Sequence, residues 1–289
     1  MKNNLKTVFL LGTLAGLMVF LGNMLGGRSG AVMGLGFAAV MNMGAYWFSD
    51  RIALKMSKAR PVSRTEAPQL YELVYRLTQR ANLPMPSLHI IPSQQPNAFA
   101  TGRNPKHAAV AVTQGLLEIM SPDELEGVVA HELAHVRNRD ILIASVAATI
   151  AGAISFVATM ARWGAMFGGG RNSNSNNPIG LAGILVASIV APLAAMIMQM
   201  AVSRSREFHA DAVGATIAGR PHGLAAALRK LELASQRIPM PVNPSAAPMF
   251  IVNPLRGMRG GGAARLFSTH PPTEERIRKL EAMSSGRIS

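Results

Sequence analysis

The sequence contains no cysteine, and it is poor in charged and aromatic residues. The lack of cysteine excludes disulfides, iron–sulfur clusters, cysteine-ligated zinc and a cysteine nucleophile. Charged residues make up 15% of the 289 residues, against about 25% in typical soluble domains, whereas apolar residues reach 49%. This composition argues against a disordered or coiled-coil protein, and it indicates that much apolar surface faces lipid.

Acidic side chains are scarce relative to basic ones. The chain has 29 Lys and Arg residues and 15 Asp and Glu residues, so its net charge is +14. Such an excess is common in nucleic-acid-binding proteins, but no motif of that class accompanies it here. We therefore expect no nucleic-acid partner, and we interpret the charge as the basic cytoplasmic face of a membrane protein.

Long uncharged runs predict four transmembrane helices. Each run has roughly 20 residues or more, the length that crosses a hydrocarbon core about 30 Å thick. The runs cover residues 7–27, 29–49, 141–161 and 179–202. Four crossings place both polar regions on one side of the membrane, and the basic residues that follow the spans place that side, with both termini, in the cytoplasm.

The predicted organisation is a transmembrane hairpin over 1–49, a cytoplasmic region over 50–140, a second hairpin over 141–202 and a second cytoplasmic region over 203–289. The fold class is mainly α, with a small sheet in the cytoplasmic part. Apolar periodicity and turn residues predict helices over 65–81 (with Thr65 as a possible N-cap), over 220–237 and after Pro272, and strands over 87–91 and 107–112.

Two further segments of the polar regions have a recognisable local pattern. Ser121, Pro122 and Glu124 form a capping box with proline at the first helical position, so a helix begins there. We expect it to continue unbroken into the third span. Residues 238–262 are rich in Pro, Gly and Asn and predict a mobile loop.

The helix that begins at Ser121 carries the sequence His131-Glu132-Leu133-Ala134-His135, an H-E-x-x-H motif. Residues four apart share one helical face, so both imidazoles can reach a single zinc ion. The glutamate beside the first histidine can then act as a base on the attacking water. The motif predicts one Zn²⁺ per chain and hydrolytic chemistry.

A catalytic zinc takes three protein ligands, so one more must come from elsewhere. His135 precedes the third span by roughly 9 Å along a helix, and Glu207 follows the fourth span by roughly 8 Å, with Asp211 one turn beyond it. Glu207 or His209 can supply the third ligand, but they lie on opposite sides of the helix and do not bind together. Asp211 comes level with His131, where it can accept that ring's second N–H.

The H-E-x-x-H motif followed by E-x-x-x-D, each beside a membrane span, resembles the membrane gluzincin metallopeptidases, which include HtpX-type proteases and CAAX prenyl proteases. Four spans, the stretch 96–100 and the stretch 268–272 with Arg276 resemble the HtpX type. The resemblance implies a cytoplasmic α+β gluzincin-like domain and a zinc endopeptidase of the bacterial inner membrane that degrades damaged membrane proteins under stress. It also implies site roles: His131, His135 and Glu207 as ligands, Glu132 as base and Asp211 as a partner of a ligand.

Supporting residues follow from the needs of peptide hydrolysis and from the same resemblance. An extended peptide is held best by an edge strand through main-chain hydrogen bonds. His270 could donate to the developing oxyanion, and Arg276 could hold Glu207 or Asp211 by a bidentate contact. The candidate edge strand for substrate comprises Asn97, Ala98, Phe99 and Ala100. Expected partners are the lipid bilayer and unfolded or membrane-protein substrates.

Other classes of function remain as alternatives. A zinc-binding membrane scaffold or pseudo-protease would keep the ligands without needing Glu132. An intramembrane protease is disfavoured because Arg137, Arg139 and Asp140 separate the motif from the span, and a transporter because the spans lack ionisable residues. Residues 238–262 could be a lid that silences the enzyme, or a site of self-cleavage.

Overall fold

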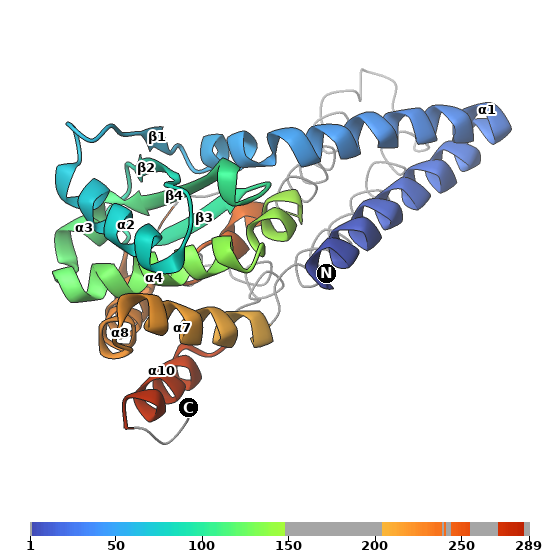
Figure 1. Ribbon diagram of the computed structural model, residues 1–289. Coiled ribbons are helices and arrows are strands. Elements are labelled where there is room, and N and C mark those ends of the chain that lie inside the picture. Colours follow the sequence, from blue (N-terminus) through green and yellow to red (C-terminus); the bar gives the residue numbers. More distant parts are fainter. Residues whose placement is uncertain (1, 148–203, 239, 241–243, 255–270, 286–289) are drawn as a thin grey trace, which may run out of the picture.

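The structure is a computed structural model that describes residues 2–147, 204–238, 240, 244–254 and 271–285 (Figure 1). Apart from residues 141–147, the predicted third and fourth spans lie outside the described residues, as does His270. The described part is mainly helical with a four-stranded sheet. Its elements are α1 (Lys2–Met56), β1 (Arg60–Pro61), α2 (Pro68–Ala81), β2 (Ser87–Ile91), β3 (Ala98–Gly102), η1 (Pro105–His107), β4 (Ala108–Thr113), α3 (Gln114–Ile119), α4 (Pro122–Arg137), α7 (Arg204–Ala218), α8 (His222–Arg237), η2 (Pro244–Met249) and α10 (Thr273–Ser284).

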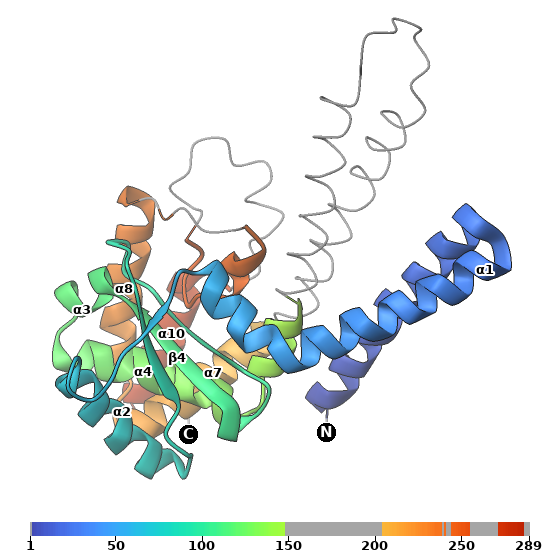
Figure 2. The same ribbon diagram turned by 90° about the horizontal axis from the view of Figure 1, so that it is seen from above.

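Helix α1 consists of two arms that project from the rest of the molecule (Figures 1 and 2). Gly27 has a φ of 56°, a left-handed conformation that suits glycine, and the chain reverses there. The two arms pack closely at Gly34. A side chain at this position would overlap the carbonyl group of Met18, so glycine permits the close approach. The Asn42 Nδ2 atom also donates to the Leu11 carbonyl oxygen at 3.1 Å. The predicted first hairpin thus corresponds to α1, which continues to Met56.

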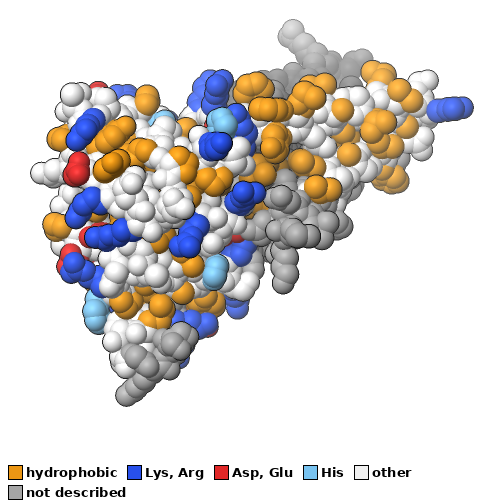
Figure 3. Space-filling view, in the orientation of Figure 1, with side chains coloured by type: hydrophobic (Ala, Val, Ile, Leu, Met, Phe, Trp, Pro, Cys, Tyr) orange, Lys and Arg blue, Asp and Glu red, His pale blue; other side chains and the backbone are white. Residues whose placement is uncertain are grey.

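The second arm has the length and composition of a membrane-spanning helix. The stretch Gly27–Met56 has 30 residues, and it contains an 18-residue window with a mean hydropathy of 1.3. Large apolar side chains such as Met33, Phe37 and Val40 are exposed along it. Figure 3 shows hydrophobic side chains along the projecting arms, with Lys and Arg side chains gathered where the arms meet the body. This surface suits contact with lipid better than contact with water.

The sheet places β3 at one edge. The strand order is β1-β2-β4-β3, with β2 and β4 parallel and both outer strands antiparallel to their neighbours. Both predicted strands are present. The candidate edge strand over residues 97–100 is observed one residue later, as β3, which pairs with β4 from Ala98 opposite Val112 to Gly102 opposite Ala108.

Two apolar clusters cover the two faces of this sheet. Ala98 and Ala100 of β3 belong to the larger cluster, which also contains residues of α2, α4, α7 and α8. Phe99 points to the opposite face and belongs to the smaller cluster, together with Ala45 and Ala53 of α1. Successive residues of a strand point to opposite faces, so one face of β3 lies in the cluster with α2, α4, α7 and α8, and the other face lies in the cluster with the projecting hairpin.

Helix α4 begins as predicted and ends earlier than predicted. The capping box is present, with the Ser121 side chain and the Glu124 side chain each bonded to the other's backbone N–H. However, α4 ends at Arg137 rather than continuing into the third span, because Arg139 adopts a φ of 58°, which a helix cannot accommodate. A new helix covers residues 141–147. Thr65 is likewise not a cap, since α2 begins only at Pro68 after Ala67.

Glycine residues allow α7 and α8 to pack backbone against backbone on α4. A Cβ atom at Gly214 of α7 would lie 2.9 Å from the N and Cα atoms of His131. Similar overlaps would arise at Gly127 against Leu224 and at Gly223 against Asp123. The crossing at Gly214 therefore sets the position of α7 relative to the H-E-x-x-H motif.

Candidate metal centre

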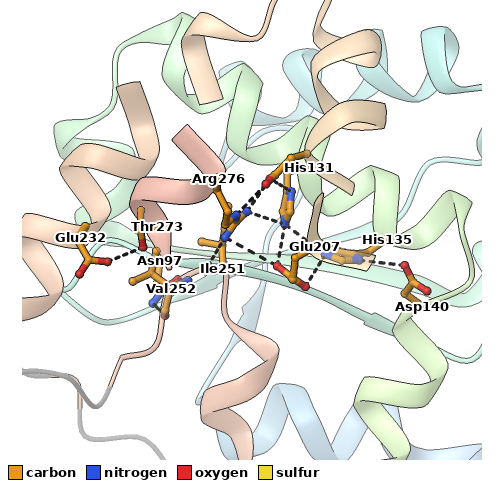
Figure 4. Close-up of polar contacts among 11 residues, drawn as sticks. Asn97, His131, His135, Asp140, Glu207, Glu232, Ile251, Val252, Thr273 and Arg276 are labelled. Atoms are coloured by element: carbon orange, nitrogen blue, oxygen red, sulfur yellow. Dashed lines mark hydrogen bonds and ion pairs between the residues drawn. The ribbon is translucent and has the colours of Figure 1, made fainter. Parts of the chain in front are cut away.

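His131, His135 and Glu207 converge between α4 and α7 (Figure 4). The two histidine Nε2 atoms are 3.2 Å apart. One Glu207 carboxylate oxygen, Oε2, lies 3.8 Å from His131 Nε2, and the other, Oε1, lies 3.5 Å from His135 Nε2. His131 and Glu207 are buried, and His135 is partly buried. The candidate ligand atoms thus surround a single point.

These separations fit a tetrahedral zinc ion. Bonds of about 2.0–2.2 Å at tetrahedral angles place neighbouring ligand atoms about 3.3 Å apart. The set of two imidazoles and one carboxylate also leaves a fourth position for a reactant. Four acidic side chains (Glu132, Asp140, Glu207 and Asp211) surround this point against two arginines (Arg206 and Arg276), so the site favours a cation.

Each histidine has a carboxylate partner on its other ring nitrogen. His131 Nδ1 lies 3.0 Å from Asp211 Oδ1, and His135 Nδ1 lies 3.3 Å from Asp140 Oδ2. Because a carboxylate only accepts, each Nδ1 is the proton donor of its pair, and each Nε2, once deprotonated, can bind a metal at the shared point. The contact of Asp140 was not predicted from the sequence, and it forms because the break after Arg137 brings Asp140 back against His135.

Arg276 fixes Asp211 from α10. Its Nε donates to Asp211 Oδ2 at 2.9 Å and its Nη2 donates to Asp211 Oδ1 at 2.7 Å. This is the bidentate contact that the sequence had suggested for Glu207 or Asp211, while Nη1 lies 3.8 Å from Glu207 Oε2. Although burial alone would raise the pKa of Asp211, Arg276 and His131 lower it to about 2. Asp211 is therefore a permanent anion beside the His131 ring.

Charges around the centre tune its titrating groups in opposite directions. Burial lowers the pKa of His131, which keeps that ring neutral. Burial would also lower the pKa of His135, but the hydrogen bond to Asp140 and the charges of Glu207 and Glu132 raise it to about 9. Burial raises the pKa of Glu132 to about 7, and the neighbouring Glu207 charge adds to the rise. A carboxyl group with a pKa near neutrality can both accept and release a proton.

The remaining candidate residues are placed as follows. His209 is exposed and lies outside the group of possible ligands. Asn97, Ala98 and Phe99 are fully buried in and before β3, and Ala100 is 6% exposed. The Ala100 N–H donates to the Glu132 carboxylate, so the edge strand and the H-E-x-x-H helix meet at this point.

A buried H-E-x-x-H helix with a glutamate ligand from a second helix defines the chain as a metallopeptidase. The sequence model of peptidase family M48 matches residues 64–284. The chain belongs to peptidase family M48.

Curated relatives match the chain almost end to end. A protease HtpX homolog of Desulforapulum autotrophicum is 56% identical over 280 residues, which covers 97% of this chain and 90% of that protein. Another, from Syntrophotalea carbinolica, is 58% identical over 285 residues, which covers 98% and 99%. The crystal structure of S. mikatae Ste24p is similar in fold, with a TM-score of 0.51 at 20% identity over 97% of this chain and 66% of that one.

Proposed function

We propose that this chain is an integral-membrane zinc metalloendopeptidase that cleaves misfolded or damaged membrane proteins at the cytoplasmic face of the bacterial inner membrane, as part of a stress response. The observation that carries the proposal is the buried Glu132 beside the convergent His131, His135 and Glu207. Burying an ionisable group costs free energy, and such groups gather at functional sites, so the buried Glu132 points to a functional role. A zinc-binding scaffold without turnover, the alternative function, gives Glu132 none.

The residues around the centre divide the work of peptide hydrolysis. The two histidines and Glu207 would hold a zinc ion, which would supply Lewis-acid chemistry to polarise the scissile carbonyl and lower the pKa of the attacking water. Glu132 accepts the proton of that water on its carboxylate and passes it to the leaving amine. Asp211 and Asp140 keep the two imidazoles oriented. His270, outside the described residues, is proposed to donate to the oxyanion.

The substrate is proposed to bind along β3, over Asn97, Ala98, Phe99 and Ala100. Three observations support this: β3 lies at the edge of the sheet, it packs against α4, and its Ala100 N–H reaches the proposed base. A polypeptide that adds to a sheet edge must present its backbone in an extended form. We therefore infer that the substrates are unfolded segments rather than compact domains.

The membrane arrangement is proposed from the sequence pattern and from α1. Four spans, with both termini and residues 50–140 and 203–289 in the cytoplasm, satisfy the positive-inside rule. Exposed basic residues (Arg51, Lys55, Lys58 and Arg60) follow the apolar part of α1. Asp140, the partner of His135, directly precedes the helix that starts the third proposed span, so the site lies close to the bilayer.

The test is zinc-dependent cleavage of casein, an unfolded protein, by the full chain purified in detergent. Glu132→Gln should retain zinc and lose at least about 100-fold in rate, because it removes general-base catalysis. Glu118→Gln, the same change at an exposed position of α3, should cleave like the wild type. If the wild type and Glu132→Gln hold zinc and neither cleaves, the scaffold alternative replaces the proposal.

A further inference from the structure

A segment of the same chain is hydrogen-bonded to the β3 edge beside the metal centre. This segment, Phe250–Asn253, is called the strap here. The Ile251 N–H donates to the Ala98 carbonyl oxygen at 3.0 Å. The Asn97 side chain brackets the next residue: its Nδ2 donates to the Val252 carbonyl oxygen at 2.8 Å, and the Val252 N–H donates to its Oδ1 at 3.4 Å (Figure 4).

The strap also reaches the residues that surround the metal centre. Arg276 Nη1 donates to the Ile251 carbonyl oxygen at 3.0 Å. The same guanidinium lies 3.8 Å from Glu207 Oε2 and 3.4 Å from His131 Nε2. One guanidinium group therefore separates the strap backbone from two of the candidate metal ligands. Figure 4 shows Ile251 between Asn97 and Glu207.

The hydrogen bonds that hold the strap on this edge are made to its main chain. Asn97, Ala98 and Arg276 bond only N–H and C=O groups of Ile251 and Val252. A polypeptide of another sequence offers the same groups, and main-chain recognition is how a sheet edge binds peptides of varied sequence. The strap thus uses the bonding groups that a substrate on this edge would need.

The strap side chains are apolar and buried. Phe250 is fully buried and its ring meets the Phe99 ring edge-to-face, with centroids 5.1 Å apart. Ile251 and Val252 are 2% and 3% exposed. The space that they fill accepts an aromatic residue followed by branched aliphatic ones. Such sequences are common in membrane proteins and are exposed when those proteins unfold.

We propose that the strap is an internal competitor that occupies the substrate-binding edge until an unfolded apolar polypeptide displaces it. The inference rests on the proposed peptidase function and deepens it, because it names the residues that would bind the main chain of a substrate: Asn97, Ala98 and Arg276. Competition of this kind lowers apparent substrate affinity by the fraction of molecules in which the edge is open. The enzyme is therefore held back without any change at its metal ligands.

The absence of cysteine from the chain allows a direct test of strap displacement. Val252→Cys is a small change at a buried strap position, and Val74→Cys is the matched change at a fully buried position of α2. Each is placed in a full-length Glu132→Gln chain in detergent, so that bound casein stays intact. The rate of maleimide labelling is measured without casein and with casein at saturation, while fluorescence anisotropy reports binding.

Displacement predicts that casein accelerates labelling at Val252→Cys and not at Val74→Cys. Because minor states are populated at roughly 0.1–10%, the acceleration should be at least about tenfold. Unchanged labelling at Val252→Cys with casein bound would show a permanent structural element and overturn the proposal. Equal acceleration at both positions would mean general opening of the fold and would overturn it as well.

A kinetic variant supplies an independent measurement. Phe250→Ala removes the buried anchor of the strap and leaves its main chain in place. We expect a fall in KM for casein of about fivefold or more with kcat retained, since the loss of a buried phenylalanine ring weakens packing by more than that factor. A rise in KM would contradict the proposal. Zinc-dependent cleavage by the wild type is judged separately, so strap displacement without cleavage would refute the peptidase function alone.

Discussion

Replacing Gly214 by alanine should weaken zinc binding although residue 214 touches no ligand atom. Helices α4 and α7 meet backbone to backbone at this glycine, and a Cβ there would lie 2.9 Å from the N and Cα atoms of His131. Ordinary carbon contacts are about 3.5–4.0 Å, so the helices must separate by about half an ångström or more. His131 and Glu207 stand on the two helices that move apart.

The size of the effect follows from the tolerance of such sites. Productive geometry is held to within about 0.5 Å, and overpacking in a well-packed region costs about 1–3 kcal/mol. If the bound site bears that cost, zinc affinity falls about tenfold to a hundredfold, at 1.4 kcal/mol per factor of ten. We expect casein cleavage at limiting zinc to fall in parallel, and to recover in part when zinc is added.

The assay is competition between the full-length protein and a fluorescent zinc chelator in detergent, with thermal unfolding measured alongside. Gly36→Ala is the matched control, because a Cβ at that position of α1 meets no atom within 4 Å. Wild-type zinc affinity in Gly214→Ala would refute the argument that this helix crossing sets the ligand geometry. A loss of affinity in Gly36→Ala as well would show that the effect is not local.

Three further predictions follow from single contacts. Asp140→Ala should lower zinc affinity about 10–100-fold, because the His135 ring loses the carboxylate that orients it, and Asp140→Asn should lower the affinity less. If Asp140→Ala binds zinc as tightly as the wild type in the chelator assay, Asp140 has no orienting role. Arg276→Ala leaves the buried Asp211 without its bidentate partner and should cost about 3–5 kcal/mol in denaturant unfolding, whereas a cost below about 1 kcal/mol would contradict the ion-pair argument. Ser121→Ala removes one half of the capping box and should cost about 0.5–2 kcal/mol of stability with zinc affinity unchanged, so a change in affinity would count against a purely local cap.

The local parts of the fold were predictable from sequence because local chemistry decides them. The capping box at Ser121 specified where α4 begins, and the spacing of His131 and His135 placed both rings on one helical face. The strand over Ser87–Ile91 and the helices over 222–237 and 273–284 also agree with their apolar patterns. The convergence with Glu207 was predicted from the order of the motifs and their similar distances from the predicted spans, and the choice of Glu207 over His209 rested partly on the family resemblance.

The parts that were missed depend on long-range packing. Helix α4 was expected to continue, but a left-handed Arg139 ends it, and the sequence offers little warning beyond Asn138 at the C-cap. Asp140 became a partner of His135 through that break. Residues 238–262 were expected to be a mobile loop, yet the described part forms η2 and the buried strap, held by Asn97 and Arg276 from distant parts of the chain. Pro, Gly and Asn content says nothing about such contacts.

The smaller apolar cluster has a mechanical consequence. It joins Ala45 and Ala53 of the projecting hairpin with Phe99 of β3 and Phe250 of the strap. Closely packed side chains transmit displacement instead of absorbing it, so a tilt of α1 must repack the residues that anchor the strap. Helices tilt when the thickness of the surrounding hydrocarbon changes. With α1 in a bilayer, as proposed, a change in bilayer thickness would therefore reach the proposed strap through one small group of side chains.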